Sequence, residues 1–294
     1  MSRFEVSTID YTRYSNRQLV AVPLLVLGLA LAVLVGWYAM TGAPVTPGIA
    51  FTGGTELQVS TDASPAEITT AFESRVPYEV ESVQQAGSGN SYLVTFQATE
   101  NSEVREITSA ADELGYGVES VSSRSASFSA ESQQQALIGI AVAFLGMSVL
   151  VFALFRTFVP SIAVVASAFS DIVIPLALMN LFGIRLTLGT VAALLMLIGY
   201  SVDSDLLLNN HILRRSGGFY ESTYRAMRTG VTMTVTSIVA MSVMTLVSSR
   251  FVFGIPLLPE VGIVLVFGLT ADLMNTYLLN VSLLRYYKYE GIAK

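Results

Sequence analysis

The fold is decided by the stretch Leu197-Ile198-Gly199-Tyr200-Ser201-Val202-Asp203-Ser204-Asp205, which continues through Leu206-Leu207-Leu208 to Asn209-Asn210-His211. It places two carboxylates, several hydroxyl groups and the only histidine of the chain in a run that otherwise has the composition of a lipid-soluble helix. An ionised side chain near the bilayer centre costs about 2.5–3.5 kcal/mol on insertion scales, so such residues usually face a bundle interior or a water path. The stretch therefore predicts a membrane helix that carries a polar site.

Composition indicates an integral membrane protein. Hydrophobic residues make up 52% of the chain and charged residues 13%, and the mean hydropathy is +0.60, whereas a soluble domain carries about 25% charged residues. The chain has no cysteine and one histidine, which excludes a disulfide framework, a thiol nucleophile and a multi-histidine zinc site. We expect no cofactor and no metal site.

Apolar runs predict six membrane spans. The run from Leu19 to Tyr38 is long enough to cross a hydrocarbon core of about 30 Å. We interpret it as an anchor, because it is too long for a signal peptide, follows a polar segment, and lacks a clear cleavage site after it. The other runs come after a long polar gap, at about 135–155, 160–182, 187–208, 230–249 and 261–284.

Basic residues set the predicted orientation, with both termini in the cytoplasm and only Arg185 and Arg250 in the short loops opposite. The predicted cytoplasmic set is Arg3, Arg13, Arg17, Arg156, Arg214, Arg215, Arg225, Arg228, Arg285, Lys288 and Lys294. We also expect an interfacial helix within residues 209–229. The predicted divisions are a cytoplasmic tail at 1–17, a first membrane helix at 18–40, an extracytoplasmic domain at 41–133, a five-helix membrane domain at 134–286 and a cytoplasmic tail at 287–294.

The polar segment between the first two spans has the pattern of a small α+β domain. Strands are predicted at about 55–60, 78–85, 91–98 and 117–128, with a turn at 87–90, and helices at about 65–75 and 101–114. Ser64-Pro65-Ala66-Glu67 is a capping box that opens the first helix. The order βαββαβ predicts a ferredoxin-like domain, an architecture that hosts many functions.

The charge of this domain suggests adaptation to high salt. Between Thr41 and Gln133 the chain has thirteen acidic residues against three arginines, and Lys288 and Lys294 are its only lysines. Dense carboxylates keep a surface hydrated where salt screens their repulsion. A modest acidic bias without this meaning is the alternative.

Asp171 is the strongest candidate for an ion-coupling residue. It lies about eleven residues into the third span, near the midplane. Pro175 follows four residues later and leaves the carbonyl of residue 171 without its helical N–H partner. The alternative is a neutral aspartic acid that hydrogen-bonds a neighbouring helix as packing.

Asp272 should lie at a similar depth in the sixth span. Gly268, Asp272, Thr276 and Asn280 recur every four residues and form a polar stripe, which lines either a helix contact or a water path.

The fourth span carries a face of small residues that ends at Asp203, near the cytoplasmic side. That face comprises Gly189, Ala192, Ala193, Met196, Gly199 and Asp203.

Two other residues near the end of the fourth span are predicted to lie outside the interior of the helix bundle. Asp205 is expected to reach the membrane interface, and His211 to lie in a solvated loop.

No nucleophile, base and orienting group occur together, and no phosphate-binding loop is present. We therefore expect neither an enzyme nor nucleotide hydrolysis, and the acidic exterior argues against nucleic-acid binding.

Three motifs make the chain resemble the SecF family. The first is Gly48-Ile49-Ala50-Phe51-Thr52-Gly53-Gly54-Thr55, which is similar to the family pattern G-[IL]-D-F-x-G-G. The second is Phe155-Arg156 followed by Ser170-Asp171-Ile172-Val173, where bacterial members often have His-Asp-Val-Val. The third runs from Ile198 to Asp205 and is similar to I-G-Y-S-[LIV]-N-D-[ST]. SecF is the smaller partner in the SecD–SecF accessory complex of protein export and a half-size member of the resistance-nodulation-division superfamily. The resemblance covers nearly the whole chain.

The resemblance implies a protein-export subunit that pairs with a SecD-like protein, works beside a SecY/SecE-type channel on secreted preproteins, and resides in the cytoplasmic membrane. It implies proton coupling, for which Asp171, Asp203 and Asp272 are the candidates. It also implies a structural or gating role for the remaining motif residues, Gly53, Gly54, Pro175, Gly199, Tyr200 and Ser201.

The chain departs from the family patterns at three places. Ala50 and Ser170 replace an aspartate and a histidine, and Asn210-His211 stands where bacterial members have Asp-Arg. The retained aspartate therefore lacks the family's cationic partner. The alternative functions are a small-molecule or lipid exporter of the same superfamily, and an intramembrane aspartyl protease built on Asp171 and Asp203, whose second signature is absent.

Overall fold

The chain is a multi-pass membrane protein. The computed structural model describes residues 10–85, 90–214, 218–249 and 258–289, and this part of the chain contains six helices long and apolar enough to span a membrane. The predicted six spans are confirmed. They are α1 (Asn16–Thr41), α5 (Ala126–Phe155), α6 (Phe158–Leu181), α7 (Leu188–Arg214), α8 (Phe219–Ser248) and a last span formed by α9 (Leu258–Met274), η1 (Asn275–Asn280) and α10 (Val281–Tyr289).

Some predictions fall outside the described residues. They concern residues 1–9 and 290–294 of the two predicted tails, most of the predicted turn at 87–90, and the loop position of Arg250.

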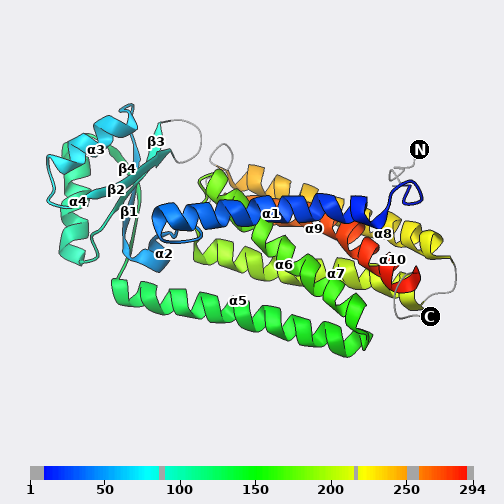
Figure 1. The fold of residues 1–294 in the computed structure, drawn as a ribbon. Coiled ribbons are helices and arrows are strands. Elements are labelled where there is room, and N and C mark those ends of the chain that lie inside the picture. Colours follow the sequence, from blue (N-terminus) through cyan, green and yellow to red (C-terminus); the bar gives the residue numbers. More distant parts are fainter. Residues whose placement is uncertain (1–9, 86–89, 215–217, 250–257, 290–294) are drawn as a thin grey trace.

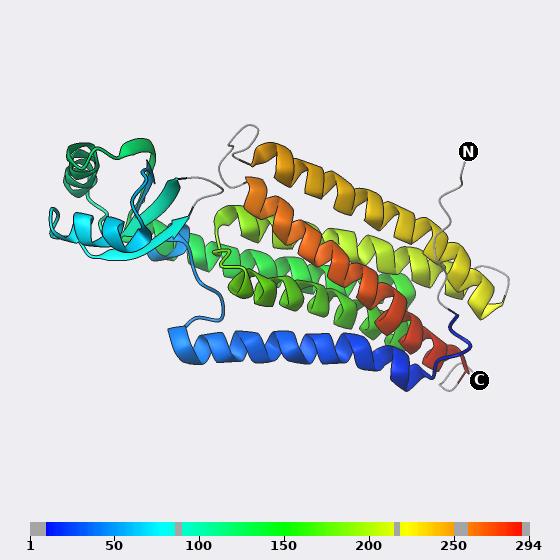
Figure 2. The same ribbon diagram turned by 90° about the horizontal axis from the view of Figure 1, so that it is seen from above.

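Helices α6, α7 and α9 form the centre of the bundle. Their spans are far more buried than those of α1, α5 and α8, which lie around them. Figure 2 shows α1 and α8 on opposite sides of the bundle, and Figure 1 shows α5 along one edge. The described chain begins and finishes at one end of the bundle, with the small α+β domain at the other end (Figure 1).

The α+β domain has the predicted ferredoxin-like order. A short helix, α2 (Ile49–Thr52), leads into β1 (Gly54–Ser60), α3 (Pro65–Glu73), β2 (Val80–Gln85), β3 (Ser91–Phe96), α4 (Asn101–Glu113) and β4 (Gly117–Arg124). The sheet order is β2-β3-β1-β4 with every neighbouring pair antiparallel. Leu57, Phe72 and Phe96 are fully buried in its core.

One strand of this domain is shorter than predicted. The alternation of the sequence predicts a last strand that reaches Phe128, but β4 ends at Arg124 and α5 begins at Ala126. The hydroxyl of Ser125 accepts a hydrogen bond from the backbone N–H of Phe128 at 3.3 Å and caps α5. The physical reason is that an N-capping serine starts a helix where sequence alternation alone suggests a continued strand.

The linker between the fourth and fifth spans also differs from the prediction. An interfacial helix is predicted within residues 209–229, but α7 continues to Arg214 and α8 begins at Phe219. His211 lies within α7 and is 7% exposed, so its predicted place in a solvated loop is wrong. Its Nδ1 lies 2.8 Å from the carbonyl oxygen of Leu207, one turn earlier in the helix.

Two motif glycines permit the entry into β1. Gly53 and Gly54 have φ angles of +78° and +117°, in a region that residues with side chains rarely adopt. A Cβ atom on Gly54 would also lie 2.6 Å from the carbonyl oxygen of Phe96. Glycine is therefore required where the chain turns from α2 into the sheet.

Candidate functional site

Asp171 joins three central elements of the bundle. It is 1% exposed, and its two carboxylate oxygens accept hydrogen bonds from different helices. Oδ2 accepts from the hydroxyl of Ser201 on α7 at 2.7 Å, and Oδ1 accepts from the amide of Asn275 on η1 at 2.6 Å. The carboxylate therefore ties α6 to both of its inner neighbours.

Asp205 forms a second set of contacts between α7 and η1. Its Oδ1 accepts hydrogen bonds from the hydroxyl of Thr276 at 2.9 Å and the amide of Asn280 at 2.7 Å. The residue is 0% exposed, so the prediction that it reaches the membrane interface is wrong. The reason is that polar partners on η1 hold the side chain inside the bundle.

Asp272 completes the cluster from α9 and is 2% exposed. Its Oδ1 accepts from the hydroxyl of Ser204 at 2.7 Å and lies 3.3 Å from the hydroxyl of Thr276. Thr276 thus lies within hydrogen-bonding distance of both Asp205 and Asp272. The predicted polar stripe of the last span is a helix contact with α7.

A π-helical turn arranges these partners. Residues Asn275–Asn280 form η1 between α9 and α10, and single π turns inside α-helices are frequent at functional sites. The wider turn lets Asn275 contact Asp171 while Thr276 and Asn280 contact Asp205. A regular α-helical period, which the sequence pattern assumes, does not predict this division.

Among the residues that the structure describes, no basic side chain forms an ion pair with the three buried carboxylates. In the described parts of the chain, the ion pairs join Arg13 to Asp10, Arg75 to Glu113, Arg185 to Glu56 and Arg225 to Glu221, all away from the cluster. An isolated buried charge is costly, so such groups are neutralised by a proton or by a bound cation. The cluster is therefore suited to taking up and releasing positive charge.

Asp203 lies apart from the buried cluster. It is exposed and lines a cavity of about 370 Å³ together with Phe155 and Asn210. A second cavity of about 100 Å³ is lined by Asp203, Ser204 and Asp272 among others, between α7, α8 and α9. The structure thus places Asp171 and Asp272 in the cluster with Asp205, and Asp203 in the lining of two cavities, the smaller of which Asp272 also lines.

The motif from Ile198 to Asp205 divides between two faces of α7. Ser201 and Asp205 point inward to the cluster, while Gly199, Tyr200 and Asp203 are exposed in the single chain. Pro175 is buried inside α6, one turn after Asp171. Sequence reasoning missed Asp205, although Ser201 and Asp205 follow the four-residue spacing of one helix face.

Sequence comparison decides the family. A family model described as protein export membrane protein SecD/SecF, C-terminal, matches residues 104–290. The protein-export membrane protein SecF of Haloferax volcanii is 63% identical over 100% of both chains. This chain belongs to the SecF family.

Other SecF relatives support the assignment across distant archaea. The SecF of Haloquadratum walsbyi is 62% identical over 100% of both chains. The SecF of Pyrococcus furiosus is 37% identical and covers 94% of this chain and 93% of its own length. The family resemblance predicted from the three motifs is confirmed.

A solved structure shares the fold. The crystal structure of SecDF, a translocon-associated membrane protein from Thermus thermophilus, superposes with a TM-score of 0.74 at 17% identity. The match covers 93% of this chain and 38% of the SecDF chain. This chain therefore has the architecture of one part of that larger protein.

Proposed function

We propose that this chain is an accessory subunit of protein export that pairs with a SecD-like membrane protein beside a SecY/SecE-type channel. The names of its SecF relatives support the export function, and its match to 38% of the SecDF chain supports a second, SecD-like partner. The substrate is a secreted preprotein emerging from the channel.

The proposed location is the cytoplasmic membrane, with both termini in the cytoplasm. The described ends of the chain lie at the end of the bundle opposite the ferredoxin-like domain (Figure 1), and the basic residues favour the termini inside. Relatives from Haloferax volcanii and Haloquadratum walsbyi, both halophilic archaea, support the interpretation of the acidic domain as an adaptation to high salt.

The observation that carries the mechanism is the buried cluster of Asp171, Asp205 and Asp272 without a basic partner among the described residues. A proton that moves through 100 mV releases about 2.3 kcal/mol. Proton uptake by the cluster and release on the other side of the membrane would couple this energy to movement of the helices.

Protonation of Asp171 changes which hydrogen bonds can exist. The carboxylate accepts from both Ser201 and Asn275. A protonated oxygen becomes a donor, and the amide nitrogen of Asn275 cannot accept a hydrogen bond from it. A proton on Oδ2 requires the Ser201 hydroxyl to accept instead of donate, and a proton on Oδ1 requires the Asn275 amide to turn its oxygen toward Asp171. In the proposed mechanism this change alters the contact of α6 with α7 or η1, and the loop between α6 and α7 transmits it to the ferredoxin-like domain.

The partner-binding surface is the exposed face of α7. Gly199, Tyr200 and Asp203 lie uncovered on a helix whose opposite face is central to the bundle. Small residues allow close approach of another membrane helix, and a polar Asp203 facing lipid would be unfavourable. A SecD-like helix would cover this face.

The test is the export of secreted proteins in a strain that depends on this gene. Asp171→Asn keeps the size of the side chain but cannot take up a proton. We expect export to slow by about tenfold or more, because export loses the roughly 2.3 kcal/mol that a proton supplies per 100 mV. Asp112→Asn, an exposed substitution on α4, is the matched control and should export normally. Unchanged export by Asp171→Asn would refute the mechanism.

A further inference from the structure

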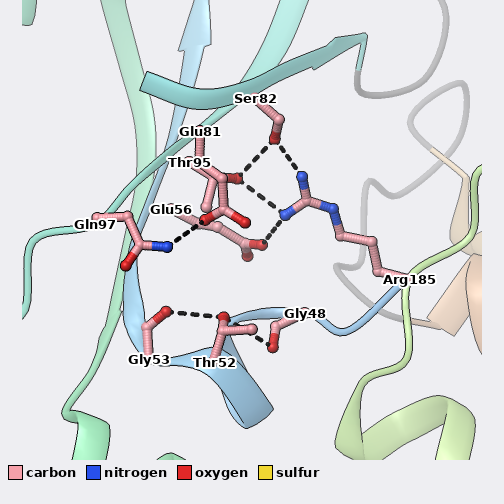
Figure 3. A network of polar contacts seen from close by, with 9 residues as sticks. All are labelled: Gly48, Thr52, Gly53, Glu56, Glu81, Ser82, Thr95, Gln97 and Arg185. Carbon is pink, nitrogen blue, oxygen red and sulfur yellow. Dashed lines mark hydrogen bonds and ion pairs between the residues drawn. The ribbon is translucent and has the colours of Figure 1, made fainter. Parts of the chain in front are cut away.

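Arg185 reaches from the loop between α6 and α7 into the sheet of the ferredoxin-like domain. Its guanidinium group meets side chains from three strands, Glu56 of β1, Ser82 of β2 and Thr95 of β3 (Figure 3). Nη1 lies 3.0 Å from the hydroxyl of Thr95 and 3.5 Å from Oε1 of Glu56. Arg185 is 8% exposed, so the membrane domain inserts a nearly buried cation into the sheet.

Backbone and amide contacts beside Arg185 also hold the ferredoxin-like domain against the loop between α6 and α7. We call this set of contacts, together with those of Arg185, the seat of the domain. The N–H of Gly48 donates to the carbonyl of Leu186 at 2.8 Å, and the N–H of Leu186 donates to the carbonyl of Thr46 at 2.8 Å. The amide of Asn180, near the end of α6, donates to the carbonyl of Pro44 at 2.8 Å. The loop that follows the Asp171 helix therefore holds the segment that leads into the domain.

Arg185 forms an ion pair with one acidic side chain and feels the charge of a second. Glu56 belongs to the ferredoxin-like domain, whereas Glu260 lies in the first turn of α9 and interacts electrostatically with both Arg185 and Glu56. Burial raises the pKa of Glu56 above its ordinary value, and the charge of Arg185 acts in the opposite direction. Within the described residues, Nε of Arg185 and Oε2 of Glu260 are buried without hydrogen-bond partners.

These unpaired groups are a donor and an acceptor of opposite charge. When the ferredoxin-like domain leaves its seat, Arg185 loses Glu56, Ser82 and Thr95 together and becomes accessible to water, and another carboxylate close by would stabilise its charge further. Glu260 is on the membrane domain and would stay behind with Arg185. Two alternative ion pairs around one cation make a two-state element.

We propose that Arg185 is the positioning residue that seats the ferredoxin-like domain on the membrane helices, and that it exchanges Glu56 for Glu260 when the domain leaves this seat. The inference deepens the proposed export function and rests on it, since movement of this domain is the step that would act on the polypeptide. Its test reads the position of the domain and does not depend on export.

The absence of native cysteine allows the position to be measured directly. Ser122→Cys on β4 and Leu181→Cys at the end of α6, both exposed, would carry spin labels in the full chain reconstituted into vesicles. Double electron–electron resonance then gives the distances between domain and bundle. With Arg185 intact, we expect one dominant distance that corresponds to the seated domain.

The two acidic partners should shift this distribution in opposite directions. Glu56→Gln weakens the seated pair and should raise the unseated population by about tenfold, the effect of one charged hydrogen bond. Glu260→Gln removes the alternative partner and should reduce the unseated population. Arg185→Gln should broaden the distribution of distances. Arg185→Lys keeps the charge with fewer donors, so the width of its distribution should lie between those of Arg185→Gln and the unmodified chain.

Arg75→Gln is the matched control, because it removes an arginine that pairs with Glu113 inside the ferredoxin-like domain. It should leave the distances unchanged. The inference is overturned if Arg185→Gln leaves the distribution unchanged, or if Glu56→Gln and Glu260→Gln shift it in the same direction. If these distances respond as expected while the Asp171→Asn variant supports normal export, the inference about Arg185 is retained and the proton-driven mechanism is refuted.

Discussion

Thr276 is shared by two of the three carboxylates at the centre of the bundle. Its hydroxyl lies 2.9 Å from Asp205 and 3.3 Å from Asp272, and the hydroxyl of Ser204 lies 3.2 Å away. A hydroxyl group has one proton to donate, so Thr276 can satisfy only one carboxylate at a time. The carboxylate that does not receive the hydrogen bond of Thr276 is the one better able to hold a proton.

This arrangement predicts a specific cost for loss of the hydroxyl. Thr276→Val keeps the shape of the side chain but removes a donor from the buried carboxylates, which then depend on Asn280 at Asp205 and on Ser204 at Asp272. We expect the free energy of unfolding to fall by about 1–3 kcal/mol. Thermal unfolding of the purified chain in detergent measures the change.

Thr270 provides the matched comparison in the same membrane span, on α9. Its exposed hydroxyl donates to the carbonyl of Val266 at 2.7 Å within α9, so Thr270→Val should have almost no effect. Equal destabilisation by the two variants would show that the hydroxyl of Thr276 has no special role in the cluster.

Residue-level prediction was right about which elements carry polar groups and wrong about the surroundings of Asp205 and His211, both of which are buried. The spacing of Asp203 and Asp205 places them on opposite faces of a helix, yet only the neighbouring helices decide which face is inside. Thr276 and Asn280, about seventy residues later, hold Asp205. A single sequence shows each partner but not that they meet.

Elements with local signals were the easiest to predict. Long apolar runs indicated the membrane helices, and the capping box of Ser64 and Glu67 located the start of α3. The π turn of η1 was not predicted, because its cause lies in contacts with α6 and α7 and not in the local sequence. The domain divisions at 41–133 and 134–286 remain predictions, since no membrane boundary marks α5.

The capping box predicts how α3 responds to pH. The carboxylate of Glu67 accepts hydrogen bonds from the backbone N–H and the hydroxyl of Ser64, each at 2.8 Å, and these bonds lower the pKa of Glu67 from its ordinary value of 4.5. The stabilisation is therefore complete above that ordinary value and is lost as the pH falls through the lowered pKa of the folded state.

Hydrogen exchange at the start of α3 in the full chain measures this effect. Protection should decrease on acidification in the unmodified protein, whereas Glu67→Gln should remove this part of the pH dependence, because glutamine accepts the same bonds without titrating. An identical pH dependence in both proteins would mean that another group controls the first turn.

At the scale of the whole molecule, the exposed face of α7 predicts where a partner binds. A Cβ atom on Gly199 would have nothing within 4 Å, so Gly199→Leu should leave the isolated chain stable. We expect it to obstruct a SecD-like helix and reduce copurification of that partner from native membranes by about tenfold or more, since overpacking a close contact costs about 1–3 kcal/mol.

Gly28→Leu is the matched control, because Gly28 is also exposed on a membrane helix and a Cβ atom there would likewise have nothing within 4 Å. It should copurify normally with the partner. Equal loss with both variants would point to a general effect on membrane insertion, and no loss with Gly199→Leu would place the interface elsewhere.

The seat between the ferredoxin-like domain and the α6–α7 loop has a consequence for the order of biosynthesis. Pro44 and Asn180 are separated by 136 residues, and synthesis at about 5–20 residues per second puts roughly ten seconds between them. The domain can form its own core before the ribosome has made the loop that holds it. During that interval it is tethered only by α1 and the growing chain, so the nascent protein passes through a stage in which this domain has not yet docked.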